Sequence, residues 1–186
     1  MISGTNTTTC RKTDMQLTQL IYTSNHGGIS INAPNGILQL SRLNNVRDAI
    51  SGALIISSQD FVQLLEGPRE AIARCLKRIM LDNRHRDLNV VYANDAEIRL
   101  FPHRSMYAVK TSALRRELFA KQLEEGTFDP FGLPATGFKQ LFQSLSHRAK
   151  AASLDRAFQT IQTGRKPTVD PAFADELVRR EIFGGP

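Results

Sequence analysis

Hydrophobic and polar positions along the first 110 residues follow two different periods, one typical of strands and one typical of helices. Alternating or wholly apolar runs predict strands at residues 16–24, 50–56, 60–67, 88–93 and 106–109. Apolar residues three and four positions apart predict helices over 36–48 and 68–80. Strand, helix, strand, strand, helix, strand is the split βαβ order of a ferredoxin-like domain. We therefore expect an α+β fold with a five-stranded mixed sheet and two helices on one face.

The helix predicted over 36–48 combines an apolar stripe with two adjacent amides. The stripe, which we expect to face the core, consists of Ile37, Leu40, Leu43 and Val46. Asn44 falls inside this arc and Asn45 beside it. Because asparagine favours helix ends, one interpretation is a pair of amides satisfied locally. The other interpretation is contact with a bound ligand.

The strand predicted over 60–67 has a glutamine at its middle. Side chains alternate between the two faces of a strand, so Gln63 shares a face with Phe61 and Leu65. A buried amide without partners costs about 1–3 kcal/mol, so both ends of Gln63 require hydrogen bonds. Either the core backbone or a ligand supplies them. Tyr22, on the first predicted strand, is by itself an ordinary strand aromatic.

Beyond residue 110 the pattern is helical. Helices are predicted over 112–123, from Phe138 to about Leu145, from a cap at Ser153 to Gly164, and from Asp170 onward. These helices are short and amphipathic, so they must cover the sheet, a second protomer or an effector. The predicted regions are a disordered N-terminal tail over 1–14, a domain over 15–110 and a C-terminal helical extension over 111–186.

Composition narrows the function classes. The formal net charge is +6, but acids are interspersed with the basic residues, so direct nucleic-acid binding is not expected. No apolar run is long enough for a membrane span, and the N-terminal residues do not resemble a signal peptide, which favours a cytoplasmic protein. Cys10 and Cys75 suggest neither a disulfide framework nor a metal site. Because no Walker-type glycine loop, nucleophile elbow or HExxH motif occurs, we expect no enzymatic activity.

Six short motifs occur in order on the predicted elements. They are Tyr22 with Ser24, Asn45-Val46-Arg47-Asp48, Ile50-Ser51-Gly52, the segment from Phe61 to Gly67, Asp82-Asn83-Arg84-His85, and Ser105-Met106. Each motif is short, but six of them at compatible spacing are specific. Over residues 16–110 the chain resembles the BLUF family of flavin-binding blue-light sensors. The resemblance implies the ferredoxin-like fold argued above, with a flavin between its two helices.

The same resemblance implies roles for individual residues. Tyr22 matches the tyrosine that donates an electron and a proton to excited flavin, and Gln63 matches its partner between tyrosine and ring. Asn45 matches the asparagine that pairs with the O4/N3 edge of the ring, and Asn44 is a second candidate contact. The remaining expected contacts are to the O2 side and the cofactor tail from Arg84 and His85, and to the ring faces from Ile37 and Ile79. The implied cofactor is FAD, with FMN or riboflavin as alternatives.

The implied mechanism is a switch. An amide is a donor at one end and an acceptor at the other, so rotating or tautomerising Gln63 reverses its hydrogen bonds without moving the backbone. The strand bearing Met106 and then the C-terminal helices would receive the signal. Many family members have tryptophan before Ser-Met, whereas this chain has Arg104 before Ser105 and contains no tryptophan. A relay by tryptophan exchange is therefore excluded, and Arg104 is expected to pair with an acid or to face solvent.

The sequence favours two functions over a third, a flavin enzyme, which would need a substrate base and a nicotinamide site that the sequence does not show. The first is a blue-light photoreceptor that binds flavin non-covalently and signals to a downstream effector protein, with a homo-oligomer expected. The alternative is a flavin-free, degenerate member of the family that serves as a protein-interaction module. Intact Tyr22, Asn45 and Gln63 favour the photoreceptor.

Overall fold

The computed structural model describes residues 16–28, 34–111 and 132–163, and within them the side chains of 16–28, 38–111 and 132–154. The chain divides into two compact units between Ser146 and His147. The N-terminal tail and the helices predicted over 112–123 and from Asp170 lie outside the described residues.

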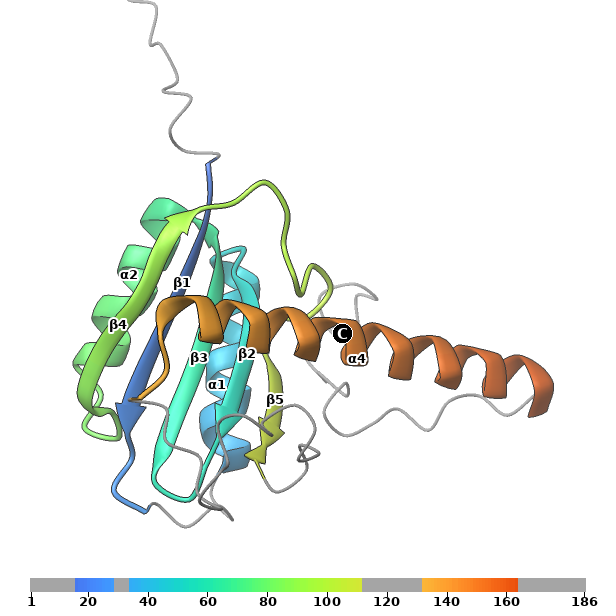
Figure 1. The fold of residues 1–186 in the computed structure, drawn as a ribbon, viewed down its shortest axis with the longest axis horizontal. Coiled ribbons are helices and arrows are strands. Elements are labelled where there is room, and N and C mark those ends of the chain that lie inside the picture. Colours follow the sequence, from blue (N-terminus) through green and yellow to red (C-terminus); the bar gives the residue numbers. More distant parts are fainter. Residues whose placement is uncertain (1–15, 29–33, 112–131, 164–186) are drawn as a thin grey trace, which may run out of the picture. The chain divides into compact units, whose positions relative to one another are not determined.

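Five strands form one sheet in the first unit (Figure 1). In chain order they are β1 (Leu17–Asn25), β2 (Ser51–Ile56), β3 (Asp60–Pro68), β4 (Arg86–Asp95) and β5 (Tyr107–Lys110). Their spatial order is β4-β1-β3-β2-β5. All neighbours pair antiparallel except β2 and β5, which pair parallel. The sheet is therefore mixed, as expected.

Helices α1 (Pro34–Arg47) and α2 (Arg69–Met80) lie on one face of the sheet, and the first part of α4 (Ala135–Thr163) crosses the other face (Figure 1). Phe138, Phe142 and Leu145 of α4 are buried. The α+β, ferredoxin-like fold predicted from the sequence is confirmed. Ser153, predicted to cap a new helix, instead lies inside α4, where its hydroxyl donates to the carbonyl of Ala149 at 2.9 Å.

The central pair of strands determines which side chains meet beneath α1 and α2. In the β1–β3 register Tyr22 lies opposite Gln63 and Leu20 lies opposite Leu65, so all four side chains point to the same face. Tyr22 and Leu65 are completely buried in the core that α2 covers. The burial of this face contributes to the domain's stability.

The opposite face of β3 contains a buried carboxylate, Glu66, that is 0% exposed. It accepts hydrogen bonds from the backbone N–H groups of Leu100 and Phe101 at 2.7 and 2.9 Å. It also accepts one from the Gln19 amide at 2.8 Å and one from the Ser51 hydroxyl at 3.4 Å. Four donors compensate the cost of burying the carboxylate, and they attach the loop before β5 to the sheet.

The apolar arc predicted for α1 does not face the core, so that prediction was wrong. Leu40 and Val46 are each 53% exposed and Leu43 is 37% exposed. Leu38 packs against the core instead, and Asn45 is buried with 2% exposure. The rotation of the helix lets Asn45 bond to the Ser105 carbonyl and the Cys75 thiol, while Leu40 borders a cleft.

A tight reversal joins α1 to β2. The N–H of Ile50 donates to the carbonyl of Asn45 at 2.7 Å and the N–H of Ala49 donates to that of Val46 at 3.2 Å, which is the Schellman pattern. Ala49 occupies the left-handed position with φ 54°, where glycine is favoured. Gly52 of β2 cannot be replaced by a larger residue without a shift of the backbone, because an added Cβ would lie 2.0 Å from the carbonyl oxygen of Leu64 on β3.

Replacing Ala49 by glycine should stabilise the domain by about 0.5–1 kcal/mol, since the left-handed conformation costs an L-residue more than it costs glycine. The free energy of unfolding from urea titration measures the effect. The matched control is Ala93→Gly in β4, an exposed strand position, which should instead destabilise by roughly 0.5–1 kcal/mol. Equal destabilisation by both substitutions would contradict the strain assigned to Ala49.

Candidate functional site

A cleft lies between α1 and α2 above the sheet, and its lining combines apolar walls with amide and guanidinium groups. The apolar side chains come from both helices and from β2 and β3: Leu40, Leu54, Phe61 and Ile79. The polar ones are Ser41, Asn44, Asn45, Gln63, Arg78, Asp82, Arg84 and His85, together with the thiol of Cys75. The exposure of Leu40 within a domain that buries most of its apolar residues indicates a surface that a ligand would cover.

Gln63 lies between this cleft and two buried side chains. The Tyr22 hydroxyl donates a hydrogen bond to Oε1 of Gln63, and Nε2 of Gln63 donates to the sulfur of Met106 at 3.4 Å. Gln63 borders the cleft, while Tyr22 and Met106 are buried with 0% and 3% exposure. The three residues form a directed chain in which each donor and acceptor is defined.

The buried position of Tyr22 determines its protonation. Burial is the main reason that the pKa of its phenol rises well above the usual value near 10, and the Cys75 and Asp82 side chains raise it further. The hydroxyl is therefore protonated at neutral pH, and it acts as the donor toward Gln63. This donor role fixes the carbonyl end of the Gln63 amide toward Tyr22.

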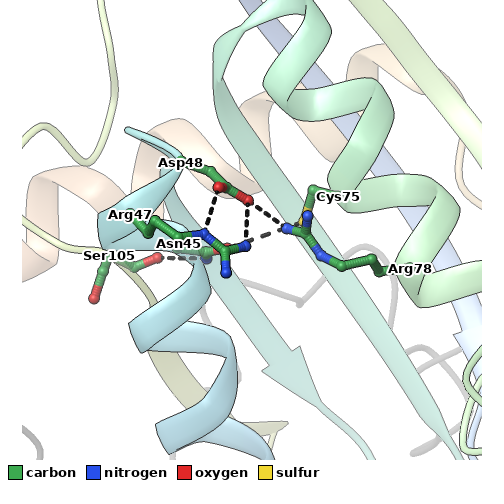
Figure 2. Close-up of polar contacts among 6 residues, drawn as sticks. All are labelled: Asn45, Arg47, Asp48, Cys75, Arg78 and Ser105. Carbon is green, nitrogen blue, oxygen red and sulfur yellow. Dashed lines mark hydrogen bonds and ion pairs between the residues drawn. The ribbon is translucent and has the colours of Figure 1, made fainter.

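Asn45, near the end of α1, connects this helix to α2 and to the segment before β5 (Figure 2). Its Nδ2 donates to the carbonyl of Ser105 at 2.8 Å, and its Oδ1 accepts a hydrogen bond from the Cys75 thiol at 4.0 Å. These partners come from the segment before β5 and from α2. The interpretation of Asn45 as a helix-end amide satisfied locally is therefore wrong, although its backbone carbonyl does close the Schellman turn.

The loop after α2 is held by an ion pair. Nε of Arg84 donates to both carboxylate oxygens of Asp82 at 2.8 and 3.0 Å, and its Nη2 also donates to Asp82. The Arg84 hydrogen bonds are the main reason that the pKa of Asp82 falls to about 2. Both side chains line the cleft, so the guanidinium faces it with its orientation fixed.

His85 packs between the cleft and the photoactive candidate Tyr22. Its ring lies edge-on to the Tyr22 ring with centroids 6.0 Å apart, and its Nδ1 is 2.8 Å from the Ser24 hydroxyl. The centroid of the Phe61 ring lies 5.1 Å from the centroid of the His85 ring. Burial lowers the pKa of His85 to about 4, partly offset by Asp82, so the imidazole is neutral at pH 7.

The structure brings most of the expected residues together. Asn44, Asn45, Gln63, Ile79, Arg84 and His85 all line the cleft. Met106 and Ser105 contact Gln63 and Asn45 from the segment that leads into β5. The side chain of Ile37 lies outside the described residues, but Leu40, one turn later on α1, lines the cleft.

Several cleft residues had no ligand role predicted from the sequence: Leu40, Ser41, Leu54, Phe61, Cys75, Arg78 and Asp82. Leu40 shares the apolar arc of Ile37, and Asp82 lies two residues before Arg84. The sequence therefore contained an indication that both residues lie near the ligand. It contained none for Arg78, because no motif and no apolar period includes it.

One of the two expectations for Arg104 was that its side chain faces solvent, and the structure differs from it. Its side chain is half-buried, and its guanidinium carbon lies 4.9 Å from the centroid of the Tyr107 ring. A guanidinium at this distance makes a cation–π contact. Arg104 therefore packs against the first residue of β5.

Neither a metal cluster nor a membrane span is found in the described residues. Among the described side chains, no group of three or more His, Cys, Asp or Glu residues has a geometry that could hold a metal ion. In the described part of the chain, no helix has the length and apolar character needed to cross a membrane.

Comparison with known proteins identifies the domain. Residues 17–107 match the family model of BLUF, the sensors of blue light using FAD. Residues 17–107 are a BLUF domain. FAD is the cofactor with which this family senses light, and the cleft described above combines apolar walls with amide and guanidinium groups, which suit a flavin ring.

Relatives support the same assignment. The dark-state structure of the BLUF protein BlrB is 29% identical, with a TM-score of 0.63 over 73% of this chain and 98% of that one. The photo-activated state of BlsA is 25% identical, with a TM-score of 0.63 over 70% and 94%. Photoactivated adenylate cyclase subunit beta of Euglena gracilis is 32% identical over 37% of this chain. This chain spans about a tenth or less of the length of the curated relatives it matches.

Acid should destabilise the domain because His85 is buried as a neutral ring. Its pKa is about 4 in the folded state, against an ordinary value of 6.5, so the unfolded chain binds more protons between those values. Stability is therefore lost as the pH falls from about 6.5 toward 4, by about 1–2 kcal/mol between pH 7 and pH 5. Urea unfolding at a series of pH values measures this loss.

The control for this pH dependence is His85→Gln, which keeps a polar side chain near Ser24 but does not titrate. The stability of this variant should change less between pH 7 and pH 5 than that of the wild type. Parallel pH profiles for the two proteins would rule out His85 as the titrating group. Asp82, with its pKa of about 2, contributes to the pH dependence of stability only below about pH 4.

Proposed function

We propose that this chain is a blue-light receptor in which Tyr22 and Gln63 form the switch. The observation that carries the proposal is the directed chain from the Tyr22 hydroxyl through Gln63 to the Met106 sulfur, with Gln63 bordering the cleft. No other side chain in the described cleft links the cleft to both a buried phenol and the segment before β5. A change at the cleft therefore reaches both partners through one amide.

The lining residues suit a planar, amide-edged ring. Asn45 and Asn44 offer amide groups to its polar edge, and Arg84 offers fixed N–H donors to a carbonyl on the other side. Leu40 and Ile79, from opposite helices, offer apolar contact to its two faces. When bound, flavin supplies absorption of blue light and, once excited, the capacity to accept an electron and a proton.

Tyr22 is the residue suited to donate both. Its phenol is protonated and buried, and its hydroxyl donates a hydrogen bond to the amide of Gln63, which borders the cleft. In the cycle we propose, the Tyr22 electron and proton leave together and return together. Gln63 meanwhile rotates or tautomerises, so that the group facing Tyr22 changes from acceptor to donor.

The reversed amide would no longer donate to Met106, and this loss is the proposed output. Three successive carbonyls in this segment accept hydrogen bonds: Arg104 from the Gly52 N–H, Ser105 from Asn45 and Met106 from Nε of Arg42. The segment is thus held by the helix and strand that form the cleft. A changed Gln63 contact would alter the strain on β5 and on the chain that follows it.

We propose that the region after residue 110 carries this output to a downstream effector protein. The domain over 15–110 would bind flavin and the extension over 111–186 would transmit the signal, in a homo-oligomer. BLUF regions of the Euglena relatives belong to much longer proteins named as photoactivated adenylate cyclase subunits. The effector of this chain would be a separate or fused protein of signalling type.

The first test is a Gln63→Leu variant of the full chain. The purified wild type should be yellow, and its absorption should shift reversibly to the red after blue light. Gln63→Leu should bind flavin and show no shift, because leucine has no hydrogen bonds to reverse. Absorption spectra before and after illumination give the answer.

Gln19→Leu is the matched control, since it removes a buried strand glutamine from the opposite face of the sheet. It should keep the shift while losing about 1–2 kcal/mol of stability through its lost bond to Glu66. A normal photocycle in Gln63→Leu would refute the switch. A colourless wild type that takes up no added flavin would favour the interaction-module alternative.

Tyr22→Phe tests the donor. The phenylalanine variant keeps the ring against His85 but lacks the hydroxyl, so flavin should bind and the red shift should disappear. Tyr92→Phe in β4 is the control and should behave as the wild type. Persistence of the shift in Tyr22→Phe would remove Tyr22 from its assigned role.

A further inference from the structure

Among the side chains that the structure describes, polar contacts join the two helices of the cleft at one end. Among the described side chains, the hydrogen bonds between the α1 region and α2 are those from Cys75 to Asn45 and from Arg78 to Asp48. Both lie where α1 ends, as Figure 2 shows. Earlier in α1, Leu40, Ser41 and Asn44 line the cleft without such a hydrogen bond to α2.

Of these two contacts, the ion pair is the stronger. Nη2 of Arg78 lies 2.6 Å from Oδ2 of Asp48, whereas the thiol contact spans 4.0 Å. The Asp48 side chain is 11% exposed and the Arg78 side chain 39% exposed, so solvent screens this pair in part. Arg47 adds donors at 2.9 and 3.3 Å, and the arginine hydrogen bonds hold the pKa of Asp48 below its ordinary value.

Arg78 is also part of the cleft wall, whereas Asp48 is not. The guanidinium therefore reaches from the cleft to the end of the opposite helix. Because its Nη2 bonds to the Asp48 carboxylate just after the end of α1, Arg78 constrains the distance between α2 and that end of α1. That distance decides how tightly two apolar walls can enclose a flat ring.

We propose that Asp48 and Arg78 form a clasp that holds α1 and α2 at the spacing required to retain the flavin. The inference rests on the proposed function, since it assumes that the cleft binds flavin. Asp48 and Arg78 are positioning residues here, and neither takes part in the switch. Breaking the clasp lets the helices separate and speeds cofactor release without altering the Tyr22–Gln63 chain.

The experiment measures the rate of FAD release from the full chain, followed by the rise in flavin fluorescence after dilution. Asp48→Asn and Arg78→Met should each release FAD about tenfold faster, which corresponds to about 1.4 kcal/mol. The double variant should release it no faster than either single variant, because one contact is lost in all three. Arg78→Lys, which keeps the charge, should give an intermediate rate.

Arg47→Met is the matched control. Arg47 bonds to the same carboxylate but lies on α1, so its loss should change the release rate by less than about twofold. Hydrogen exchange of the flavin-free protein provides a second measurement. Exchange should increase around residues 45–48 and 75–81 in Asp48→Asn and Arg78→Met but not in Arg47→Met.

Two results would overturn the clasp. Unchanged release from Arg78→Met would show that the ion pair does not retain the cofactor. If adding Arg78→Met to Asp48→Asn made FAD release a further tenfold faster, Arg78 would be shown to hold the flavin directly.

The light response separates this proposal from the function on which it rests. Asp48→Asn reconstituted with excess FAD should show the same red shift as the wild type. A flavin-loaded wild type without a red shift would refute the switch, while the release rates would still decide the clasp. A wild type that bound no flavin would refute both.

Discussion

The antiparallel pairing of β1 with β3 is the constraint on which the rest of the site depends. Its register places Tyr22 opposite Gln63, on the face covered by α1 and α2. Because both side chains are buried there, the phenol is kept protonated and the amide must use its partners within the protein. A slip of one residue in either strand would turn the side chain of that strand to the α4 face, separate Tyr22 from Gln63 and remove the site.

Buried polar groups organise both faces of the sheet. On the cleft face, the amides of Asn45 and Gln63 are attached to Ser105 and Met106. On the other face, Glu66 holds the backbone of residues 100–101, whose Leu100 carbonyl accepts the hydroxyl of Ser146 on α4 at 2.8 Å. The segment between residues 99 and 106 is therefore tied to both faces of β3, so a rearrangement at either face bears on the same piece of chain.

Charge pairing gives the cleft its shape. Its two arginines are each bound to a carboxylate, Arg84 to Asp82 within one loop and Arg78 to Asp48 across the two helices. The first pair aims donors into the cleft from a short loop. The second pair joins separate helices, so its geometry depends on how those helices pack. Ala49, in the left-handed conformation, directs the chain from this end of α1 into β2.

Much of this protein was determined by the local sequence. The period of two around Gln63 and the period of 3.6 on α2 predicted the sheet and its helices, because burial on one face imposes those periods on any strand or helix. The polar residue on an apolar strand face identified Gln63, and the order of short motifs identified the family. Tertiary structure alone decided the rotation of α1, the partners of Asn45 and the pairing of Arg78 with Asp48. These contacts join residues 30 to 60 positions apart, and no local period records which distant group a side chain meets when two elements pack.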